Sequence, residues 1–246
     1  MRAIWKIISS TPETEPVFSG GAHARSLIVV RSARARQMRL VVSPRDGMVR
    51  LTIPQRAGIA DARRWAESKR GWIEAQLAAL PSPQPIIPGM ALTFAGEALQ
   101  LDWSEGHPRK PCRIGSALRV GGPRDSLETR TLRWLKTEAR AVLEAESRDL
   151  AARIGVTLGR IGVGDPVSRW GSCSPSGDIR YSWRLILAPE AVRRATVAHE
   201  IAHRVHMNHG PRFHALVAEL FGEDPAFARR WLRAHGAGLH WFGRSP

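Results

Sequence analysis

Residues 189–213 read PEAVRRATVAHEIAHRVHMNHGPRF, and the rest of the chain is best interpreted from this segment. Small and apolar residues surround two histidines, and the pattern predicts a helix from Pro189 through about Met207 that ends before Gly210. Positions four apart lie on one face of a helix, so His199 and His203 are expected to point the same way. The apolar neighbours predict that this helix is buried.

His199, Glu200 and His203 form the H-E-x-x-H pattern. Two imidazoles at this spacing can bind one zinc ion, at about 2.0–2.1 Å each. Glu200 lies about 100° round the helix, too far round to be a third ligand but able to reach a metal-activated water. We therefore expect Glu200 to be a general base. Seven of the nine histidines fall in the last 48 residues, which places the chemistry there.

A catalytic zinc site has three protein ligands and one open position. His209 lies beyond the predicted helix, from where it can fold back toward the metal, and it is the favoured third ligand. His206 would reach the ion only with strain, because on a continuous helix its Cα lies about 10 Å along the axis from that of His199. His214 and Glu219, on the next predicted helix, remain alternatives.

The composition narrows the class of protein. The chain has 246 residues, 43% of them hydrophobic, which is enough to bury a core. Two cysteines, Cys112 and Cys173, argue against a disulfide-stabilised secreted scaffold. No apolar run reaches the roughly 18 residues of a membrane helix, and the N-terminus does not resemble a secretory signal. We expect a cytoplasmic protein with no membrane segment.

Three regions are expected along the chain. Residues 1–22 resemble a flexible tail, and residues 23–122 a β-rich accessory region with one helix at 61–80. Gly121-Gly122-Pro123 marks the expected boundary, so that residues 123–246 form the catalytic domain. In that domain the pattern predicts a helix at 126–154, a strand at 179–189, and short helices at 211–222 and 224–236 after the histidine helix.

Residues 168–217 resemble the YgjP-like metal-dependent hydrolases, which are zincin-type metallopeptidase relatives and are similar in turn to the SprT- and WLM-type proteases. The segment SPRDGMVRLTIP, the Trp72-Ile73 helix and the WGSC segment extend the likeness over most of the chain. The family motif H-E-x-x-H-x-x-x-x-x-H falls on His199, Glu200, His203 and His209. Ser182 stands near a position where the family has asparagine.

The resemblance implies an α+β fold with a small zincin-like core, in which the active-site helix lies beside a short mixed sheet with an edge strand near the metal. It also implies one Zn²⁺ ion and hydrolysis of protein or peptide substrates. His206, Tyr181 and Arg169 are candidates for stabilising the transition state. We expect the WGSC segment at 170–173 to support the cleft, with Cys173 a small buried apolar side chain.

Two other functions remain open. The same activated water could attack phosphorus, which would make the protein a nucleoside triphosphate pyrophosphatase or another phosphoanhydride hydrolase. Alternatively, the formal net charge of +15 indicates a nucleic-acid-associated protein with a degenerate metal site. In that case nucleic acid would bind the arginine-rich N-terminal region, at Arg31, Arg34, Arg36 and Arg39. The intact Glu200 and the scarcity of aromatic residues before Trp65 count against this second alternative.

Overall fold

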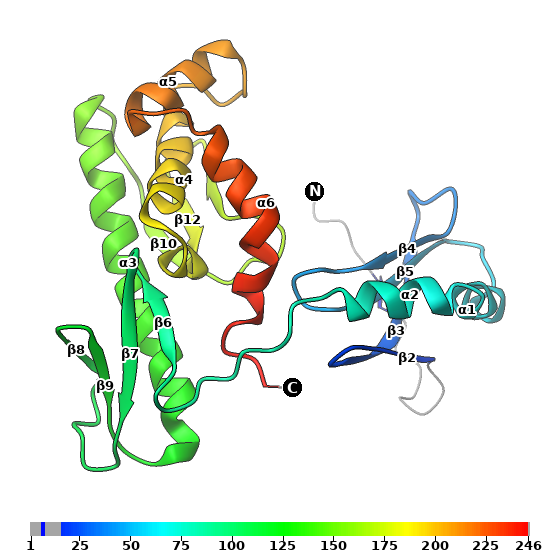
Figure 1. Cartoon of the computed structure of the whole chain (residues 1–246). Coiled ribbons are helices and arrows are strands. Elements are labelled where there is room, and N and C mark those ends of the chain that lie inside the picture. The colour runs from blue at the N-terminus through cyan, green and yellow to red at the C-terminus, as the bar shows by residue number, and fades with distance from the viewer. Residues whose placement is uncertain (1–5, 8–15, 246) are drawn as a thin grey trace. The chain divides into compact units, whose positions relative to one another are not determined.

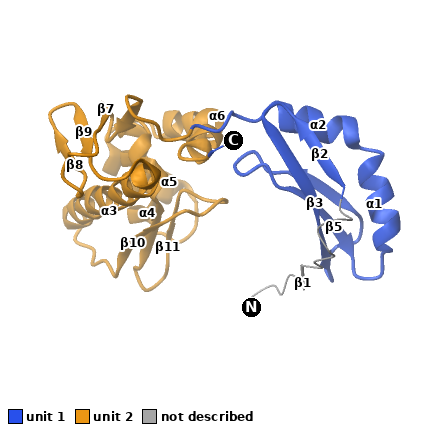
Figure 2. Cartoon of the chain, turned by 90° about the horizontal axis from the view of Figure 1, so that it is seen from below, with its two compact units in different colours: residues 1–84, 245–246 blue, residues 85–244 orange. Residues whose placement is uncertain are grey.

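A computed structural model describes residues 6–7 and 16–245. It combines helices with several sheets, which confirms the predicted α+β class. The chain divides into two compact units, residues 1–84 with 245–246 and residues 85–244 (Figure 1, Figure 2). This division differs from the boundary expected at residues 122/123, because residues 85–122 fold with the second unit. No helix in the described ranges is long and apolar enough to cross a membrane.

The first unit is a five-stranded sheet with two helices. Its order is β1-β3-β5-β4, with β2 also paired to β3. Apolar residues of β3 and β5 alternate into the core because successive side chains of a strand point to opposite faces. The elements are β1 (Lys6–Ile7), β2 (Val17–Gly20), β3 (His23–Ser32), β4 (Arg39–Val42), β5 (Val49–Pro54), α1 (Ile59–Glu67) and α2 (Arg70–Ala78).

Two sequence predictions for this unit need correction. The single helix expected at 61–80 is two helices, and at the break the Ser68 hydroxyl donates to the Trp65 carbonyl oxygen at 2.7 Å. Such a side-chain bond competes with continuation of the helix. The tail expected at 1–22 lies mostly outside the described residues, and its residues 17–20 form β2.

The arginine-rich surface of the first unit is partly structural. Arg31 donates from Nη1 to the carbonyl oxygens of Gln55 at 2.6 Å and Ala57 at 2.8 Å, which ties the end of β3 to the loop after β5. Arg34, Arg36 and Arg39 are exposed. The structure therefore gives Arg31 a role that needs no nucleic acid.

The second unit begins with a four-stranded sheet of order β6-β7-β9-β8. Its elements are β6 (Ala91–Phe94), β7 (Glu97–Trp103), β8 (Cys112–Ile114) and β9 (Ala117–Val120), followed by the long helix α3 (Leu127–Arg153). Leu99, Leu101 and Leu118 of this sheet are buried in one cluster with Leu135 and Leu143 of α3. This shared core is why residues 85–122 belong to the second unit.

A three-stranded mixed sheet of order β10-β12-β11 follows, with β10 parallel and β11 antiparallel to β12. The strand predicted at 179–189 stops at Ser182, and Trp183–Leu187 form a 3₁₀ turn. The buried Arg184 in that turn pairs with Asp165 at 2.7 Å. The elements are β10 (Ile161–Gly164), β11 (Gly171–Cys173) and β12 (Ile179–Ser182).

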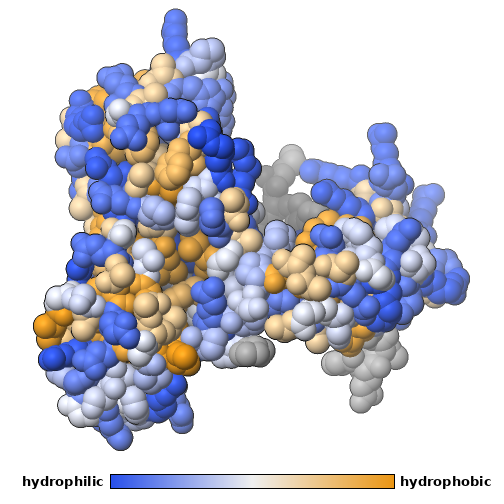
Figure 3. All heavy atoms as spheres, in the orientation of Figure 1, coloured by the Kyte–Doolittle hydropathy of each residue, from blue (hydrophilic) through white to orange (hydrophobic). Residues whose placement is uncertain are grey.

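Three helices complete the unit: α4 (Glu190–Ala202), α5 (Pro211–Phe221) and α6 (Ala226–Trp241). The prediction for α4 extended five residues too far, to Met207. The helix predicted at 224–236 continues to Trp241, because Gly236 is a packing position and not a stop: a Cβ atom there would lie 2.6 Å from Cζ2 of Trp170. On the face shown in Figure 3, hydrophilic side chains predominate and apolar ones gather in patches.

Candidate active site

Helix α4 is held in the core of the second unit. Val192, Val197 and Ile201 are fully buried, as the apolar pattern predicts. Arg193 is also buried, and its guanidinium pairs with the carboxylate of Glu146 on α3 at 2.8 Å. A buried charge is tolerated only when it is paired in this way. The pair and the apolar contacts fix α4 against α3, so the residues at the end of α4 have a rigid support.

The chain turns back after α4 and brings a third imidazole to the first two. Nε2 of His209 lies 3.2 Å from Nε2 of His199. One ligand atom from each of His199, His203 and His209 falls within 4.8 Å of the others. Among the described residues, these three histidines form a cluster that could hold a metal ion. They are the same three residues that the sequence favours as ligands.

Two of the three imidazoles favour the neutral form that a metal requires. Burial, together with the neighbouring His203 and His209, lowers the pKa of His199 to about 4. Burial also lowers the pKa of His203. A neutral imidazole offers one nitrogen lone pair, and three such nitrogens converging on one point are a typical donor set for a divalent transition metal. The residues present therefore fit a single metal ion.

His206 contributes its backbone instead of its side chain. Its carbonyl oxygen lies 3.1 Å from Nδ1 of His203. A carbonyl can only accept, so Nδ1 carries the proton and Nε2 keeps its lone pair. Such a bond orients a metal-binding histidine. The helical strain expected for His206 does not arise, because α4 has already ended at Ala202.

Phe213 of α5 forms the apolar support of the three histidines. Its ring centroid lies 4.9 Å from that of His199, 4.6 Å from that of His203 and 4.7 Å from that of His209. The phenyl ring is 1% exposed. Contact with one buried ring restricts the rotamers of all three imidazoles, which favours a preorganised cluster.

The other candidate ligands lie apart from this cluster. The ring of His214 is exposed, and its centroid is 6.4 Å from that of His209. Glu219 is exposed on α5. Of the alternatives weighed from the sequence, the structure brings only His209 to the two helical histidines.

Glu200 is buried beside the cluster, and β11 makes room for it. A Cβ atom at Gly171 would lie 2.7 Å from Cδ of Glu200, so a side chain at position 171 would collide with the carboxylate. Burial raises the pKa of Glu200 to about 7, and the positive charge of Arg169 offsets part of the rise. A carboxylate with this pKa can both accept and return a proton near neutral pH.

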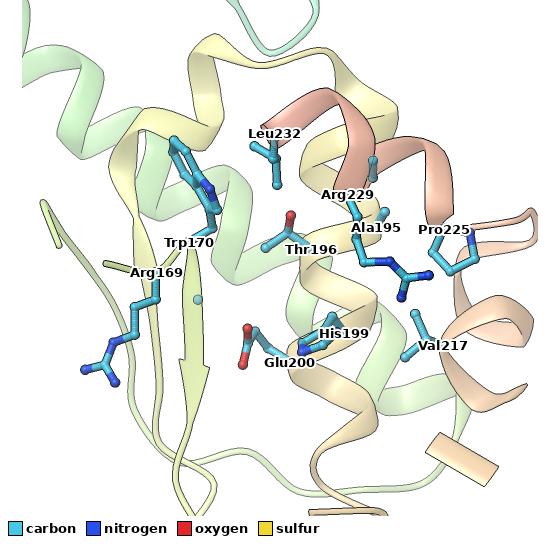
Figure 4. A pocket seen from close by; sticks show the side chains of 12 residues that line it. Arg169, Trp170, Ala195, Thr196, His199, Glu200, Val217, Pro225, Arg229 and Leu232 are labelled. Carbon is cyan, nitrogen blue, oxygen red and sulfur yellow. The ribbon is translucent and has the colours of Figure 1, made fainter. Parts of the chain in front are cut away.

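Arg169 and Tyr181, the two remaining candidates, have different positions. Arg169 is exposed, and Figure 4 shows its guanidinium on the other side of Glu200 from His199. Tyr181 is fully buried, and its hydroxyl lies 2.9 Å from Oγ of Ser147. Ser147 already donates to a carbonyl oxygen of α3, so Tyr181 must donate to Ser147. This placement favours a packing role for Tyr181 over a contact with substrate.

A cavity of about 270 Å³ opens at His199 and Glu200 (Figure 4). It runs along α4 between the start of β11 and helices α5 and α6. Trp170 closes part of it, which agrees with the expected supporting role of the WGSC segment. Twelve residues line it: Arg169, Trp170, Gly171, Ala195, Thr196, His199, Glu200, Val217, Pro225, Ala228, Arg229 and Leu232.

Sequence reasoning did not find three parts of this site: the ring of Phe213, the carbonyl of His206 and the pocket wall on α6. The sequence did carry a signal for the role of Gly171. A glycine inside a strand often marks a point where another part of the chain comes close to the backbone. The segment after Gly222, which supplies the cavity wall on α6, had no such pattern to indicate that it belongs to the site.

The family model described as "YgjP-like, metallopeptidase domain" matches residues 36–235, which is most of the chain. No curated protein and no solved structure gives a significant match.

Proposed function

Because the chain belongs to the YgjP-like family of metallopeptidases, we propose that it is a zinc-dependent peptidase that cleaves intracellular protein substrates. The family implies a metal ion and proteins as substrates. The observation that carries the finer proposal is the convergence of three imidazoles beside a buried carboxylate, with His199 and Glu200 lining one cavity.

His199, His203 and His209 would hold the metal. Three nitrogen donors with one open position are typical of catalytic zinc, whereas structural zinc sites are closed and rich in cysteine. Burial raises the pKa of Cys173, which keeps this nearby thiol protonated and disfavours it as a ligand. When bound, a zinc ion would supply Lewis-acid polarisation of the scissile carbonyl and of the attacking water.

Glu200 would move the proton. Its carboxylate accepts a proton from the attacking water and later delivers it to the leaving nitrogen. Its buried position favours the protonated intermediate state, since burial already raises its pKa to about 7. Gly171 leaves the space that this carboxylate occupies. Arg169 lies close enough to influence Glu200 electrostatically and remains a candidate for contact with the substrate.

The proposal includes a zincin-like core. Helix α4 contacts the three-stranded mixed sheet through Gly171 of β11, and β11 is the end strand of that sheet. An end strand has backbone groups on one side that the sheet does not use, and an extended peptide can pair with them. We also propose a cytoplasmic location, which the free state of Cys112 and Cys173 supports.

The test is hydrolysis by purified, zinc-loaded protein of two substrate panels, casein with a peptide library and a set of nucleoside triphosphates. We expect new peptide termini, identified by mass spectrometry, and no release of phosphate or pyrophosphate. The variant Glu200→Gln should lose this cleavage. Glu219→Gln, which neutralises an exposed carboxylate on α5, is its matched control and should cleave as the wild type does. Phosphate or pyrophosphate release without peptide products would replace the proposal with a phosphoanhydride hydrolase.

A further inference from the structure

The inner wall of the cavity beside His199 and Glu200 is apolar. Ala195 on α4, Val217 on α5 and Ala228 on α6 line it and are at most 4% exposed. Leu232 and the indole of Trp170, which are partly buried, also line it (Figure 4). Three helices and the segment before β11 thus converge on a small space next to the predicted catalytic residues.

The one hydroxyl on this wall is already satisfied. Oγ1 of Thr196 donates to the carbonyl oxygen of Val192 at 2.9 Å, within α4. A polar or charged group placed against this inner wall would lose its water without gaining an equivalent partner, which costs free energy. The wall therefore selects an apolar side chain, and a volume of about 270 Å³ suits one such side chain better than a larger ligand.

A positively charged side chain, that of Arg229, lies at the rim of this cavity. Arg229 is exposed in the first turn of α6 and lines the cavity together with His199. Within the part of the chain that the structure describes, no carboxylate lies within 4.0 Å of its guanidinium. The nearby Asp224 accepts from the backbone N–H of Ala226 at 2.9 Å and so helps to start α6. The Arg229 guanidinium is available to an anion that comes with the substrate.

We propose that this cavity is a substrate subsite that takes one apolar side chain and that Arg229 binds a carboxylate next to it. Arginine holds a carboxylate through two parallel hydrogen bonds, which gives orientation as well as affinity. The carboxylate has two sources, the free C-terminus of a substrate or an acidic side chain beside the apolar residue. The inference rests on the proposed peptidase function and names the substrate class of that site.

The test measures kcat and KM of the zinc-loaded full chain on matched peptides. One pair ends in leucine with a free carboxylate or with an amide, and a second pair is longer and carries aspartate or lysine beside an internal leucine. Three variants are compared with the wild type: Arg229→Ala, Arg229→Glu, and Arg230→Ala as the matched control. Arg230 is an exposed neighbour on α6 that does not line the cavity.

We expect the wild type to prefer the carboxylate member of at least one pair, and the pair that shows the preference identifies the source. Arg229→Ala should raise KM for that peptide about tenfold, with kcat little changed, because a charge-assisted bond is lost from binding. Arg229→Glu should reverse the preference, toward the amide in the first pair or toward lysine in the second, an outcome that misfolding cannot produce. Arg230→Ala should match the wild type.

Equal effects of Arg229→Ala and Arg230→Ala, or no preference within either pair, would overturn the subsite. Cleavage of none of the peptides would instead remove the peptidase proposal. In that case, a binding experiment tests whether the subsite exists. Binding of N-acetyl-leucine and of N-acetyl-leucinamide to the same zinc-loaded protein is followed through tryptophan fluorescence. Tighter binding of the carboxylate form, lost in Arg229→Ala alone, supports the subsite, and equal binding of both forms contradicts it.

Discussion

Gly171 of β11 lies directly against the carboxylate of Glu200: a Cβ atom at position 171 would be 2.7 Å from Cδ of Glu200. The strand and the helix are therefore spaced for a residue without a side chain. A glycine in the WGSC segment thereby sets the position of the proposed general base, although it has no chemistry of its own.

Gly171→Ala should displace Glu200 and lower kcat by about 100-fold, since a misplacement of about 1 Å can cost this much. The zinc content should stay at the wild-type level, because the three atoms nearest to a Cβ at position 171 belong to Glu200 and not to a histidine. Gly162→Ala is the matched control: Gly162 belongs to β10 of the same sheet, and a Cβ atom there would meet nothing within 4 Å. Equal activities of the two variants would show that position 171 does not constrain the carboxylate.

The zinc content of single-histidine variants tests which imidazoles bind the metal. His209→Ala should lose bound zinc, measured by elemental analysis after dialysis, because it removes one of three converging nitrogens. His206→Ala should keep one zinc per chain, since only the backbone carbonyl of His206 contacts His203. His214→Ala is the exposed control and should also keep it. Loss of zinc from His206→Ala with retention in His209→Ala would reverse the assignment.

The raised pKa of Glu200 predicts a pH-dependent stability in the metal-free protein. The folded state holds a proton on Glu200 up to about pH 7, whereas the unfolded state loses it near pH 4.5. The unfolded state thus binds fewer protons between these values, so the contribution of Glu200 to the free energy of unfolding falls as pH rises through this window. Above about pH 7, ionisation of Glu200 lowers the free energy of unfolding by roughly 3 kcal/mol in total.

Glu200→Gln removes this ionisation. In chelator-treated protein, the variant should gain stability over the wild type between pH 5 and pH 8, by roughly 2 kcal/mol in the free energy of unfolding from denaturant titration. Because the variant and the wild type are compared at both pH values, any pH-independent difference in their packing energy cancels. Glu219→Gln should show no such gain. A Glu200→Gln difference that does not change with pH would mean that the carboxylate is already ionised in the folded state.

Glu146 holds the buried Arg193 in place, which predicts a large effect on stability. Glu146→Ala leaves the guanidinium buried without its partner and should lower the free energy of unfolding by about 3–5 kcal/mol. The control is Glu144→Ala on the same helix, which breaks the exposed pair with Arg148 at 2.6 Å and should cost less than about 1 kcal/mol. Chemical denaturation of both variants distinguishes a buried pair that holds α4 on α3 from an ordinary surface pair.

Local features of the sequence predicted the centre of the site. The spacing of His199 and His203 fixes their common face. His209 is expected beyond the helix because of the Gly-Pro stop, and it lies off the helix for a different reason, since α4 already ends at Ala202. These signals depend on residues close to one another in the chain. In the structure, Nε2 of His209 lies 3.2 Å from Nε2 of His199.

Features set by distant contacts could not be predicted. Residues 85–122 join the second unit because Leu99 and Leu118 pack in the cluster of α3, which no local pattern reveals. Helix α6 passes through Gly236 because Trp170 packs there, although glycine normally signals a helix end. The apolar wall of the cavity depends on α4, α5 and α6 together, so it became visible only in the folded chain.

The central claim is that Glu200 is the base of a zinc peptidase, and one measurement tests it most directly. Peptide cleavage by Glu200→Gln is compared with that of the wild type at equal, measured zinc content per chain. The account predicts full zinc occupancy with a fall in kcat of at least about 100-fold, the scale of general acid–base catalysis. A Glu200→Gln variant that holds its zinc and cleaves at the wild-type rate would contradict it.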